Sequence, residues 1–260
     1  MSGQHPDGST GAVSGLPRSE ETRRTADAMA VQLSRELSGA ENVFHGLASP
    51  LPAVACGIAM RVHNPEILYL NIAGGVNIAP GKLSISTCAP EFVQNSSSFF
   101  SLTEIFDFSA RGRLDTAFLG GVQVDRAGRI NNSVIGDFSR PKVKFPGGAG
   151  SAAIVPTARR TVVWRTRHDH RSIVERCAFV TAAGNVDTVV TSLGVLRMED
   201  GELRLSGWFP WSDPDSVRSA TGFPLQISEE AGVIPEPDEE ELAALAAVDP
   251  TGIRYSEFKS

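Results

Sequence analysis

The sequence predicts an α/β fold built on a single open, mainly parallel sheet that is flanked by helices. Short apolar runs that end in glycine alternate with helical stretches: the run from Val43 to Gly46 and the run from Glu66 to Gly74 enclose an apolar stretch from Ala53 to Val62. This alternation is typical of parallel strands joined by crossover helices. In such sheets, ligands bind beyond the carboxyl ends of the strands.

The composition agrees with a folded domain of this kind. The chain has 260 residues, 41% of them hydrophobic and 21% charged, as in soluble globular proteins with a core. Its net charge of −6 disfavours nucleic acid as a partner. It contains no uninterrupted apolar stretch of about 18 residues, so no membrane span is expected. The polar beginning does not resemble a secretory signal, and three cysteines without CxxC spacing indicate buried free thiols, so we expect a cytoplasmic protein.

The first elements can be placed from composition and capping signals. Residues 1–18 are rich in Gly, Ser and Pro and are expected to form a disordered leader, which leaves 19–260 as one domain. Ser19, followed by Glu20 and Glu21, is a candidate cap for a helix that ends near Gly39.

Further elements follow in chain order. A helix is predicted over 103–108, and another opens in the acidic, solvated stretch 235–241 and runs to 248. Strands are predicted over 114–119, 161–164, 176–180, 187–192, 195–198 and 203–205. Hairpin turns are expected at Asp125 to Gly128 and at Met198 to Gly201, and the end from Arg254 to Ser260 is expected to fray.

Two glycine-rich turns within residues 114–153 predict one wall of an active site. The first is Gly120-Gly121, and the second is Gly147-Gly148-Ala149-Gly150-Ser151. Glycine has no Cβ, so backbone N–H groups can approach a ligand closely. With Gly46 and Gly74, these glycines should converge on one edge of the sheet.

The histidines give little support for a metal site. His45 follows an apolar pair at a strand end and is interpreted as structural. His168 and His170 are two residues apart but lack a third ligand, so a basic surface loop is favoured and no metal is predicted.

Several segments resemble the B subunits of class I coenzyme A transferases of the glutaconate type. They are AFLGGVQVD at 117–125, PGGAGS at 146–151, VVTSLGVL at 189–196, SATGFPL at 219–225 and DPTGIR at 249–254. The resemblance implies the NagB-like CoA-transferase fold, a partner A-type subunit, a heterotetramer of two A and two B chains, and an acyl-CoA substrate. Coenzyme A would belong to the substrate, with no separate cofactor. Gly147, Gly148, Ala149, Gly150 and Ser151 would contact the CoA or acyl group.

One position departs from the transferase pattern. These transferases carry a glutamate that becomes acylated, and Ile72-Ala73-Gly74 stands in its place. Isoleucine cannot act as a nucleophile, and no glutamate lies nearby in the sequence, because Glu66 is at the other end of the strand. In this respect the chain resembles the B subunit of a ring-opening hydrolase of steroid (cholesterol ring C/D) degradation. That enzyme hydrolyses a carbon–carbon bond of a cyclic ketone acyl-CoA, and the resemblance implies that the A subunit supplies the carboxylate base.

Hydrolytic ring opening needs an activated water, a stabilised oxyanion and a proton for the leaving enolate. Arg126 could orient a carboxylate or neutralise the enolate, with a solvated turn residue as the alternative. Asn71 and Gln123 could donate to a carbonyl, with satisfied strand-end amides as the alternative. We therefore predict Arg126 and Asn71 as catalytic residues and Gln123 with the apolar floor Ile72, Ala73 and Gly74 as substrate-binding residues.

Two other functions stay open. The chain could be a subunit of a CoA transferase that moves CoA between carboxylic acids, with its nucleophile elsewhere, or a non-catalytic scaffold or binding subunit. A Ser-His-Asp hydrolase is disfavoured because no GxSxG motif occurs, and a dehydrogenase because no GxGxxG follows a strand.

Overall fold

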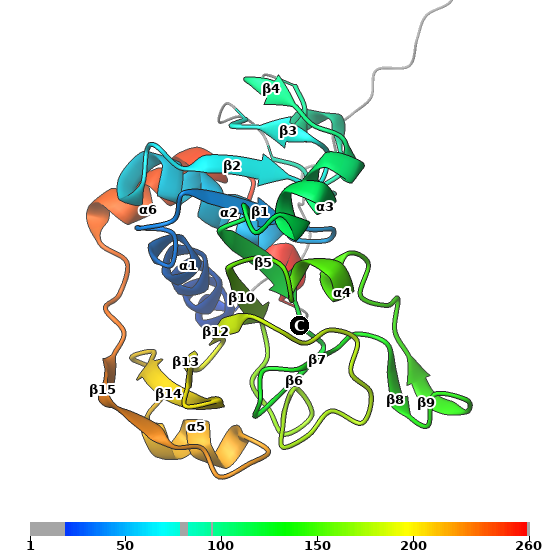
Figure 1. Cartoon of the computed structure of the whole chain (residues 1–260). Helices are drawn as coiled ribbons and strands as arrows, with labels where there is room; N and C mark the ends of the chain where they lie inside the picture. Colours follow the sequence, from blue (N-terminus) through cyan, green and yellow to red (C-terminus); the bar gives the residue numbers. More distant parts are fainter. Residues whose placement is uncertain (1–18, 79–82, 95, 259–260) are drawn as a thin grey trace, which may run out of the picture.

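The computed structural model describes residues 19–78, 83–94 and 96–258 (Figure 1). The predicted leader, residues 1–18, lies outside the described residues. The centre is a ten-stranded sheet in the order β15-β14-β13-β12-β10-β5-β1-β2-β3-β4. Its middle consists of parallel strands, namely β1 (Asn42–His45), β2 (Leu68–Asn71), β5 (Thr116–Gly120), β10 (Arg160–Arg165) and β12 (Val186–Thr191).

Antiparallel pairs extend this parallel centre on both sides. One flank is formed by β13 (Gly194–Glu199), β14 (Glu202–Trp208) and β15 (Ile227–Val233), of which β15 runs parallel to β14. The other flank is formed by β3 (Gly75–Val76) and β4 (Ser98–Phe99). The prediction of an open, mainly parallel sheet is therefore confirmed.

The two faces of the sheet bury alternate residues of each strand. Val43 and Phe118 belong to one core cluster, and their neighbours Phe44 and Ala117 belong to the other, as the two-residue period of a strand requires. The first cluster is covered by α1 (Glu20–Arg35), α2 (Pro50–Ile58), η1 (Ala59–His63), η2 (Pro90–Phe92), α6 (Glu239–Val248) and η3 (Ile253–Glu257). The second is covered by α3 (Leu102–Ala110), α4 (Ser151–Ile154) and α5 (Pro214–Ala220).

Two small sheets stand beside the main one (Figure 1). The first contains β6 (Gln123–Asp125), β7 (Ile130–Asn131) and β11 (Ile173–Val174), and the second is the β8 (Val134–Gly136) and β9 (Pro141–Lys144) hairpin. The predicted turn at Asp125 is confirmed, because β6 and β7 pair antiparallel and Asp125 Oδ1 accepts from the N–H groups of Ala127 and Arg129.

The predicted cap at Ser19 is confirmed, and a further capped helix begins near the end of the chain. Ser19 Oγ accepts from the Thr22 N–H at 3.1 Å, and α1 begins at the next residue, as predicted. Asp238 caps α6 in the same manner. None of the helices within the described residues is long and apolar enough to cross a membrane.

The strand predicted over 176–180 is wrong. The segment that forms a strand lies earlier in the sequence and is β11 (Ile173–Val174). Beyond it, the backbone makes single contacts, such as that of the Cys177 N–H with Asp125 Oδ2 and an isolated bridge between Ala182 and Ile130. An apolar run without a neighbouring strand partner does not become a strand.

Two predictions of surface exposure near the end of the chain are also wrong. The segment from Arg254 does not fray, because Arg254 is 8% exposed and pairs with Asp27 and Asp249, which holds η3 in place. Residues 259–260 lie outside the described residues. Glu241, predicted on a solvated helix face, is buried against Arg35.

Histidine and cysteine burial also differ from expectation at two positions. His168 is not on a surface loop: it is buried between the hydroxyls of Thr191 and Thr221, at 2.8 and 2.9 Å from its ring nitrogens. Burial lowers the pKa of His168 to about 4, so its ring is neutral at pH 7. Cys88 is exposed, whereas the other two cysteines are buried as predicted.

Candidate functional site

A pocket of about 760 Å³ opens at the carboxyl edge of the parallel strands. Four segments form most of its wall: 46–49 after β1, 119–122 at the end of β5, 164–166 at the end of β10, and 146–151 before α4. Of the glycines predicted to converge here, Gly46, Gly120 and Gly148 line the pocket, and Gly74 does not.

The glycine-rich loop before α4 needs its small residues. A Cβ on Gly148 would lie 2.4 Å from both Ser151 Oγ and Thr181 Cγ2. Gly147 has a φ of +100°, in the left-handed region that favours glycine. All five residues predicted to contact CoA, from Gly147 to Ser151, lie in the pocket lining. Their binding role stays a prediction.

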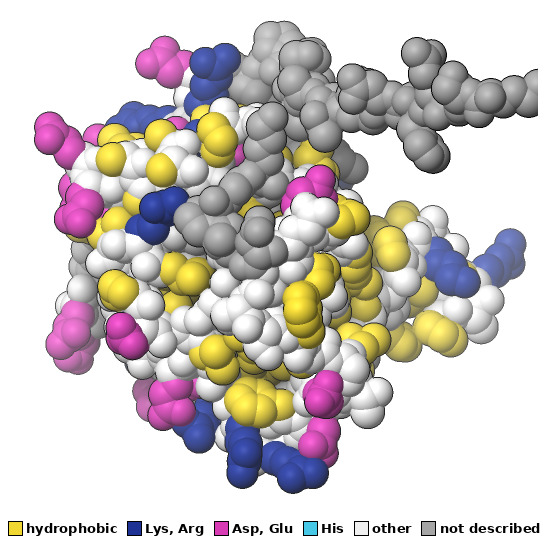
Figure 2. Space-filling model, turned by 90° about the horizontal axis from the view of Figure 1, so that it is seen from above, with side chains coloured by type: hydrophobic (Ala, Val, Ile, Leu, Met, Phe, Trp, Pro, Cys, Tyr) yellow, Lys and Arg dark blue, Asp and Glu magenta, His cyan; other side chains and the backbone are white. Residues whose placement is uncertain are grey.

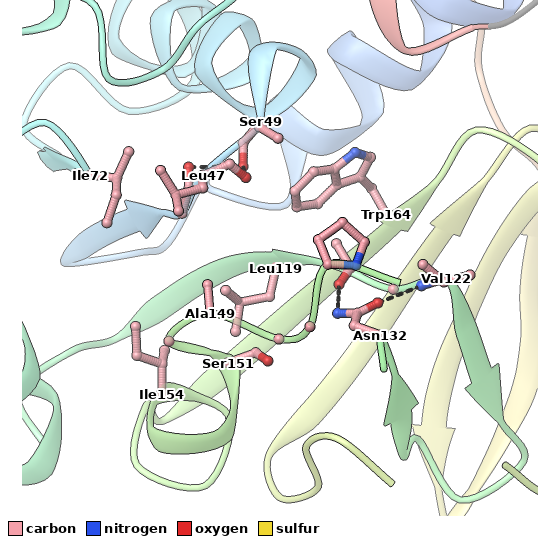
Figure 3. A pocket seen from close by; sticks show the side chains of 18 of the residues that line it. Leu47, Ser49, Ile72, Leu119, Val122, Asn132, Ala149, Ser151, Ile154 and Trp164 are labelled. Atoms are coloured by element: carbon pink, nitrogen blue, oxygen red, sulfur yellow. Dashed lines mark hydrogen bonds between the residues drawn. The ribbon is translucent and has the colours of Figure 1, made fainter. Parts of the chain in front are cut away.

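Asn132 joins this loop to the end of β5 (Figure 3). Its Nδ2 donates to the Gly120 carbonyl at 2.8 Å, and its Oδ1 accepts from the Val122 N–H at 2.7 Å. Its own carbonyl accepts from the Gly147 N–H. One asparagine therefore fixes both glycine-rich turns, a role that the sequence pattern did not reveal.

Ile72 lies in the pocket wall, facing the space between Leu47 and Leu119 (Figure 3). Its side chain gives this part of the pocket an apolar surface, with Ile154 on the α4 side. Ala73 and Gly74, predicted with Ile72 as the floor, are outside the lining.

The structure places Asn71, predicted as catalytic, outside the pocket lining. Its buried amide makes four hydrogen bonds to backbone groups: Nδ2 donates to the carbonyls of Gly75 and Phe92, and Oδ1 accepts from the N–H groups of Ala73 and Gly75. The alternative of a satisfied strand-end amide describes these contacts. A catalytic role for Asn71 stays a prediction and would require these bonds to break.

Gln123 and Arg126 also lie outside the lining. Gln123 bridges the Arg171 carbonyl and the Asn131 amide. Arg126 pairs with Glu202 at 2.5 Å and with Glu175 at 3.6 Å. Their roles toward substrate stay predictions, and each side chain already has protein partners.

Glu257 is a carboxyl group in the pocket that the sequence did not reveal. Its Oε1 accepts from the Leu51 N–H at 2.8 Å and its Oε2 from Trp164 Nε1 at 2.6 Å, so it joins the start of α2 to β10. Burial raises the pKa of Glu257 to about 7, although the two hydrogen bonds act in the opposite direction. The sequence predicted that the segment from Arg254 to Ser260 would fray. Only the resemblance of residues 249–254 to the transferases indicated an ordered chain next to Glu257.

Arg165 is the other charged residue in the lining. Its Nε is buried and has no hydrogen-bond partner among the described residues. Burial is the main cause that lowers its pKa. Ser151 Oγ, in the glycine-rich loop, is also buried without a partner there.

His45 lies next to the pocket but is not part of the lining. Its Nε2 is 2.6 Å from the Tyr69 hydroxyl, and burial lowers the pKa of His45 to about 4. These contacts match the structural interpretation. Within the described ranges, no group of three His, Cys, Asp or Glu side chains could hold a metal ion.

The chain is similar to known proteins over most of its length. Residues 26–218 match the coenzyme A transferase family. The B subunit of the 3-oxoadipate CoA-transferase of Pseudomonas knackmussii is 28% identical over 244 residues, which cover 86% of this chain and 93% of that protein. The cholesterol ring-cleaving hydrolase IpdB subunit of Rhodococcus jostii is 25% identical over 252 residues, which cover 89% and 95%.

Solved structures agree with these sequence matches. A chain of the decarboxylase AibA/AibB superposes with a TM-score of 0.84 at 31% identity, over 89% of this chain and 97% of that one. The names of these relatives state three different reactions, namely CoA transfer, ring cleavage and decarboxylation. The family model spans most of the chain, and the chain therefore belongs to the coenzyme A transferase family.

Proposed function

We propose that the chain is the B-type subunit of a hetero-oligomeric enzyme that cleaves a carbon–carbon bond of an acyl-CoA. The reaction proposed is hydrolytic ring opening of a cyclic ketone CoA thioester from steroid rings C and D. The observation that carries this proposal is Ile72 in the pocket wall, where the resemblance to the transferases leads us to expect their acylated glutamate. Without that nucleophile, thioester exchange through this position is not possible.

The pocket supplies surfaces for such a substrate. Ile72, Leu119 and Ile154 form apolar wall that suits a ring derived from a steroid. The loop from Gly147 to Ser151 would contact the CoA or acyl group. The proposal places the carboxylate base on an A-type subunit, within a heterotetramer of two A and two B chains.

We retain Arg126 and Asn71 as proposed catalytic residues. Gln123, Ala73 and Gly74 are retained as proposed substrate-binding residues. Each of the three polar side chains now contacts protein groups. Their participation thus requires rearrangement when the A-type subunit or substrate binds. Unchanged turnover of both Arg126→Ala and Asn71→Ala in the complex would favour the scaffold function.

Decarboxylation of an acyl-CoA is the second candidate. It is favoured by the 31% identity to the AibA/AibB decarboxylase chain over almost the whole length. Decarboxylation breaks a carbon–carbon bond, releases carbon dioxide and leaves a carbanion that takes up a proton. It needs neither an acylated glutamate nor water, so the apolar wall at Ile72 is compatible with it.

One experiment separates these reactions. The chain is co-purified with the product of the adjacent reading frame and mixed, in heavy-oxygen water, with a steroid-derived cyclic ketone CoA thioester and a carboxylate acceptor. Mass spectrometry should show the gain of one water, with the label in a new carboxylate and CoA still attached. Loss of carbon dioxide would instead establish decarboxylation. Transfer of CoA to the acceptor would establish a transferase, contrary to the proposal.

A further inference from the structure

The β8–β9 hairpin, residues 134–144, forms an arm that stands apart from the main sheet. Within the described residues its two strands pair only with each other, Val134 with Lys144 and Ile135 with Val143. In Figure 1 the arm projects at the right of the molecule. A two-stranded hairpin alone is only marginally stable in water, because it has little apolar area to bury. We therefore expect another surface to cover the arm in the assembled protein.

The turn at the tip of the arm is fixed by the chain itself. Asp137 Oδ1 accepts from the Ser139 N–H at 2.7 Å and from the Ser139 hydroxyl at 2.6 Å, which closes the turn. The ring of Phe138 stacks on the ring of Phe179, with centroids 4.9 Å apart. The tip is therefore preorganised, which lowers the entropy lost when a partner binds it.

The arm exposes apolar side chains to solvent. Phe138 is 66% exposed and Val143 is 45% exposed. Val143 shares a face of the hairpin with the half-buried Ile135, because directly paired residues lie on the same side. Val180, next to Phe179, is exposed as well. Exposed apolar area of this kind is typical of protein–protein contacts, in which an aromatic side chain often contributes much of the binding free energy.

The exposed charges of the arm are mainly basic. Arg140, Lys142 and Lys144 are exposed, and the two lysines lie on the face opposite to Val143. Asp137 is the one acidic residue of the arm, whereas the whole chain has a net charge of −6. Figure 2 shows dark blue side chains together with yellow ones on the lobe that projects at the right. A complementary surface is therefore apolar with an acidic border.

A second copy of this chain does not offer such a surface in a closed assembly. Contact between two arms would bring their basic side chains together, which is unfavourable. In the acidic stretch 229–240 every charged residue is acidic, and this stretch includes part of β15. In Figure 1, β15 and the arm lie on opposite sides of the molecule. Contact between the arm and β15 would thus be head-to-tail and would add chain after chain instead of closing a two-fold dimer.

The foot of the arm belongs to the pocket. Asn132, before β8, and Pro146 and Gly147, after β9, line the pocket. The Phe145 N–H donates to the Ser133 carbonyl and the Gly147 N–H to the Asn132 carbonyl, so the pairing of the hairpin continues into the pocket wall. A chain seated on the arm is therefore next to the pocket, where the proposed function requires the carboxylate base of an A-type subunit.

We propose that the β8–β9 arm is the docking element for the A-type subunit, which receives Phe138 and Val143 in an apolar groove bordered by acidic side chains. The inference rests on the proposed function in taking an A-type subunit as the partner. It adds the part of this chain that holds the partner and the charge of the partner's surface. Because the arm leads into the glycine-rich loop, docking also fixes the position of that loop beside the substrate.

The test uses the complex co-purified with the product of the adjacent reading frame. Its dissociation is followed by sedimentation velocity over a dilution series. Phe138→Ala should release free chains at concentrations about tenfold or more above those for the wild type, as expected for the loss of a central aromatic contact. The double variant Lys142→Glu/Lys144→Glu should do the same, because two attractive charges become repulsive.

Each arm variant has a matched control. Leu242→Ala removes an exposed apolar side chain from α6, and Arg111→Glu/Arg113→Glu reverses two exposed charges before β5, at the amino edge of the parallel strands. Both controls should leave the assembly unchanged. Thermal melting by circular dichroism should be similar for all variants, because the substituted side chains are exposed.

Hydrogen–deuterium exchange gives a second measurement without any substitution. In the wild-type complex, the paired amides of the arm should exchange about a hundredfold or more slowly than those of an unstructured chain. An uncovered two-stranded hairpin, which is only marginally stable, exchanges at nearly the unstructured rate.

The outcomes separate this inference from the proposed function. Equal dissociation of wild type and both arm variants, or rapid exchange of the arm amides in the complex, would overturn the inference. Halving of the complex into units of one A and one B chain would assign the arm to the contact between such units, and would overturn it too. A wild-type chain that does not bind the adjacent product would refute the partner on which both proposals rest. Release of free chains by the arm variants of a complex that transfers CoA or releases carbon dioxide would refute ring opening and leave this inference standing.

Discussion

The Glu257 carboxyl group gives a sharp test of the electrostatics of the pocket. It lies beside the apolar wall with its oxygens held by Leu51 and Trp164. Burial raises the pKa of Glu257 from 4.5 to about 7. The substitution Glu257→Gln removes the titratable carboxyl group and keeps the side-chain volume nearly constant. Its amide oxygen can accept from one of the two N–H donors, while its NH₂ group opposes the other.

The sign of the pH effect follows from proton binding. Between pH 4.5 and 7 the folded state holds a proton that the unfolded state has released, so this group makes the wild-type protein less stable as pH rises. Each unit of pKa shift corresponds to about 1.4 kcal/mol. Between about pH 5 and about pH 8, the wild type should therefore lose about 2 to 3 kcal/mol relative to Glu257→Gln.

The assay is urea denaturation of wild type and variant at both pH values, followed by circular dichroism. The absolute stability of the variant is lowered at both, because one buried donor is left without an acceptor at a cost of about 1 to 3 kcal/mol. The deciding quantity is the difference in unfolding free energy between wild type and Glu257→Gln, compared between pH 5 and pH 8. Glu66→Gln, at an exposed position, is the control and should show no such change. A difference that is constant from pH 5 to pH 8 would refute the reasoning.

Three further predictions concern residues around the pocket. Asn71→Ala removes four buried hydrogen bonds to backbone groups and should lower the free energy of unfolding by at least about 2 kcal/mol in urea titrations, and a loss below about 1 kcal/mol would contradict this. Burial lowers the pKa of His168 to about 4, so wild-type stability should fall as pH drops from 6.5 toward 4, and His168→Gln should flatten that slope in the same titrations. Gly148→Ala should weaken acyl-CoA binding about tenfold or more in calorimetry, because the new Cβ would displace Thr181 and Ser151. The control Gly39→Ala, with open space around its Cβ, should bind acyl-CoA normally. Equal affinities of the two variants would contradict a role of the 147–151 loop in binding.

The parallel centre of the fold was predictable because its strands carry their signals locally. The runs at 43–46, 66–72 and 114–119 are apolar, short and ended by glycine, and each became a central strand. Strand prediction failed where strand formation depends on a pairing partner that is distant in the sequence. The apolar run at 176–180 has no strand beside it, and β15 became a strand without having been expected.

The sequence predicted only those parts of the site that contain a glycine-rich pattern. The loop at 147–151 and the end of β5 line the pocket as expected. Gly147 has a positive φ, and a Cβ on Gly121 or Gly148 would come too close to neighbouring side chains. Asn132, Arg165 and Glu257 come from segments that are far apart in the sequence and meet only in the folded chain. Conversely, Asn71 and Arg126 stand at strand ends, but their polar groups turn to protein partners that no local pattern reveals.

The face shown in Figure 2 has many charged side chains along its edge and hydrophobic side chains scattered over it. Exposed large hydrophobic residues on β4 and α3 include Phe99 and Leu102, which are 65% and 55% exposed. Exposed apolar area of this kind is typical of interaction sites. An A-type subunit is the partner that the proposed function requires.

The link between Glu257 and the start of α2 bears on how the chain matures during synthesis. The pocket draws on residues from Phe44 to Glu257, so a nascent chain that has already formed β1, β5 and β10 still has an open cavity. It closes on this side only when η3 docks and Glu257 reaches Leu51 and Trp164. Until then an apolar surface stays accessible to chaperones and proteases, and no proteolytic fragment that lacks either region can hold the whole site.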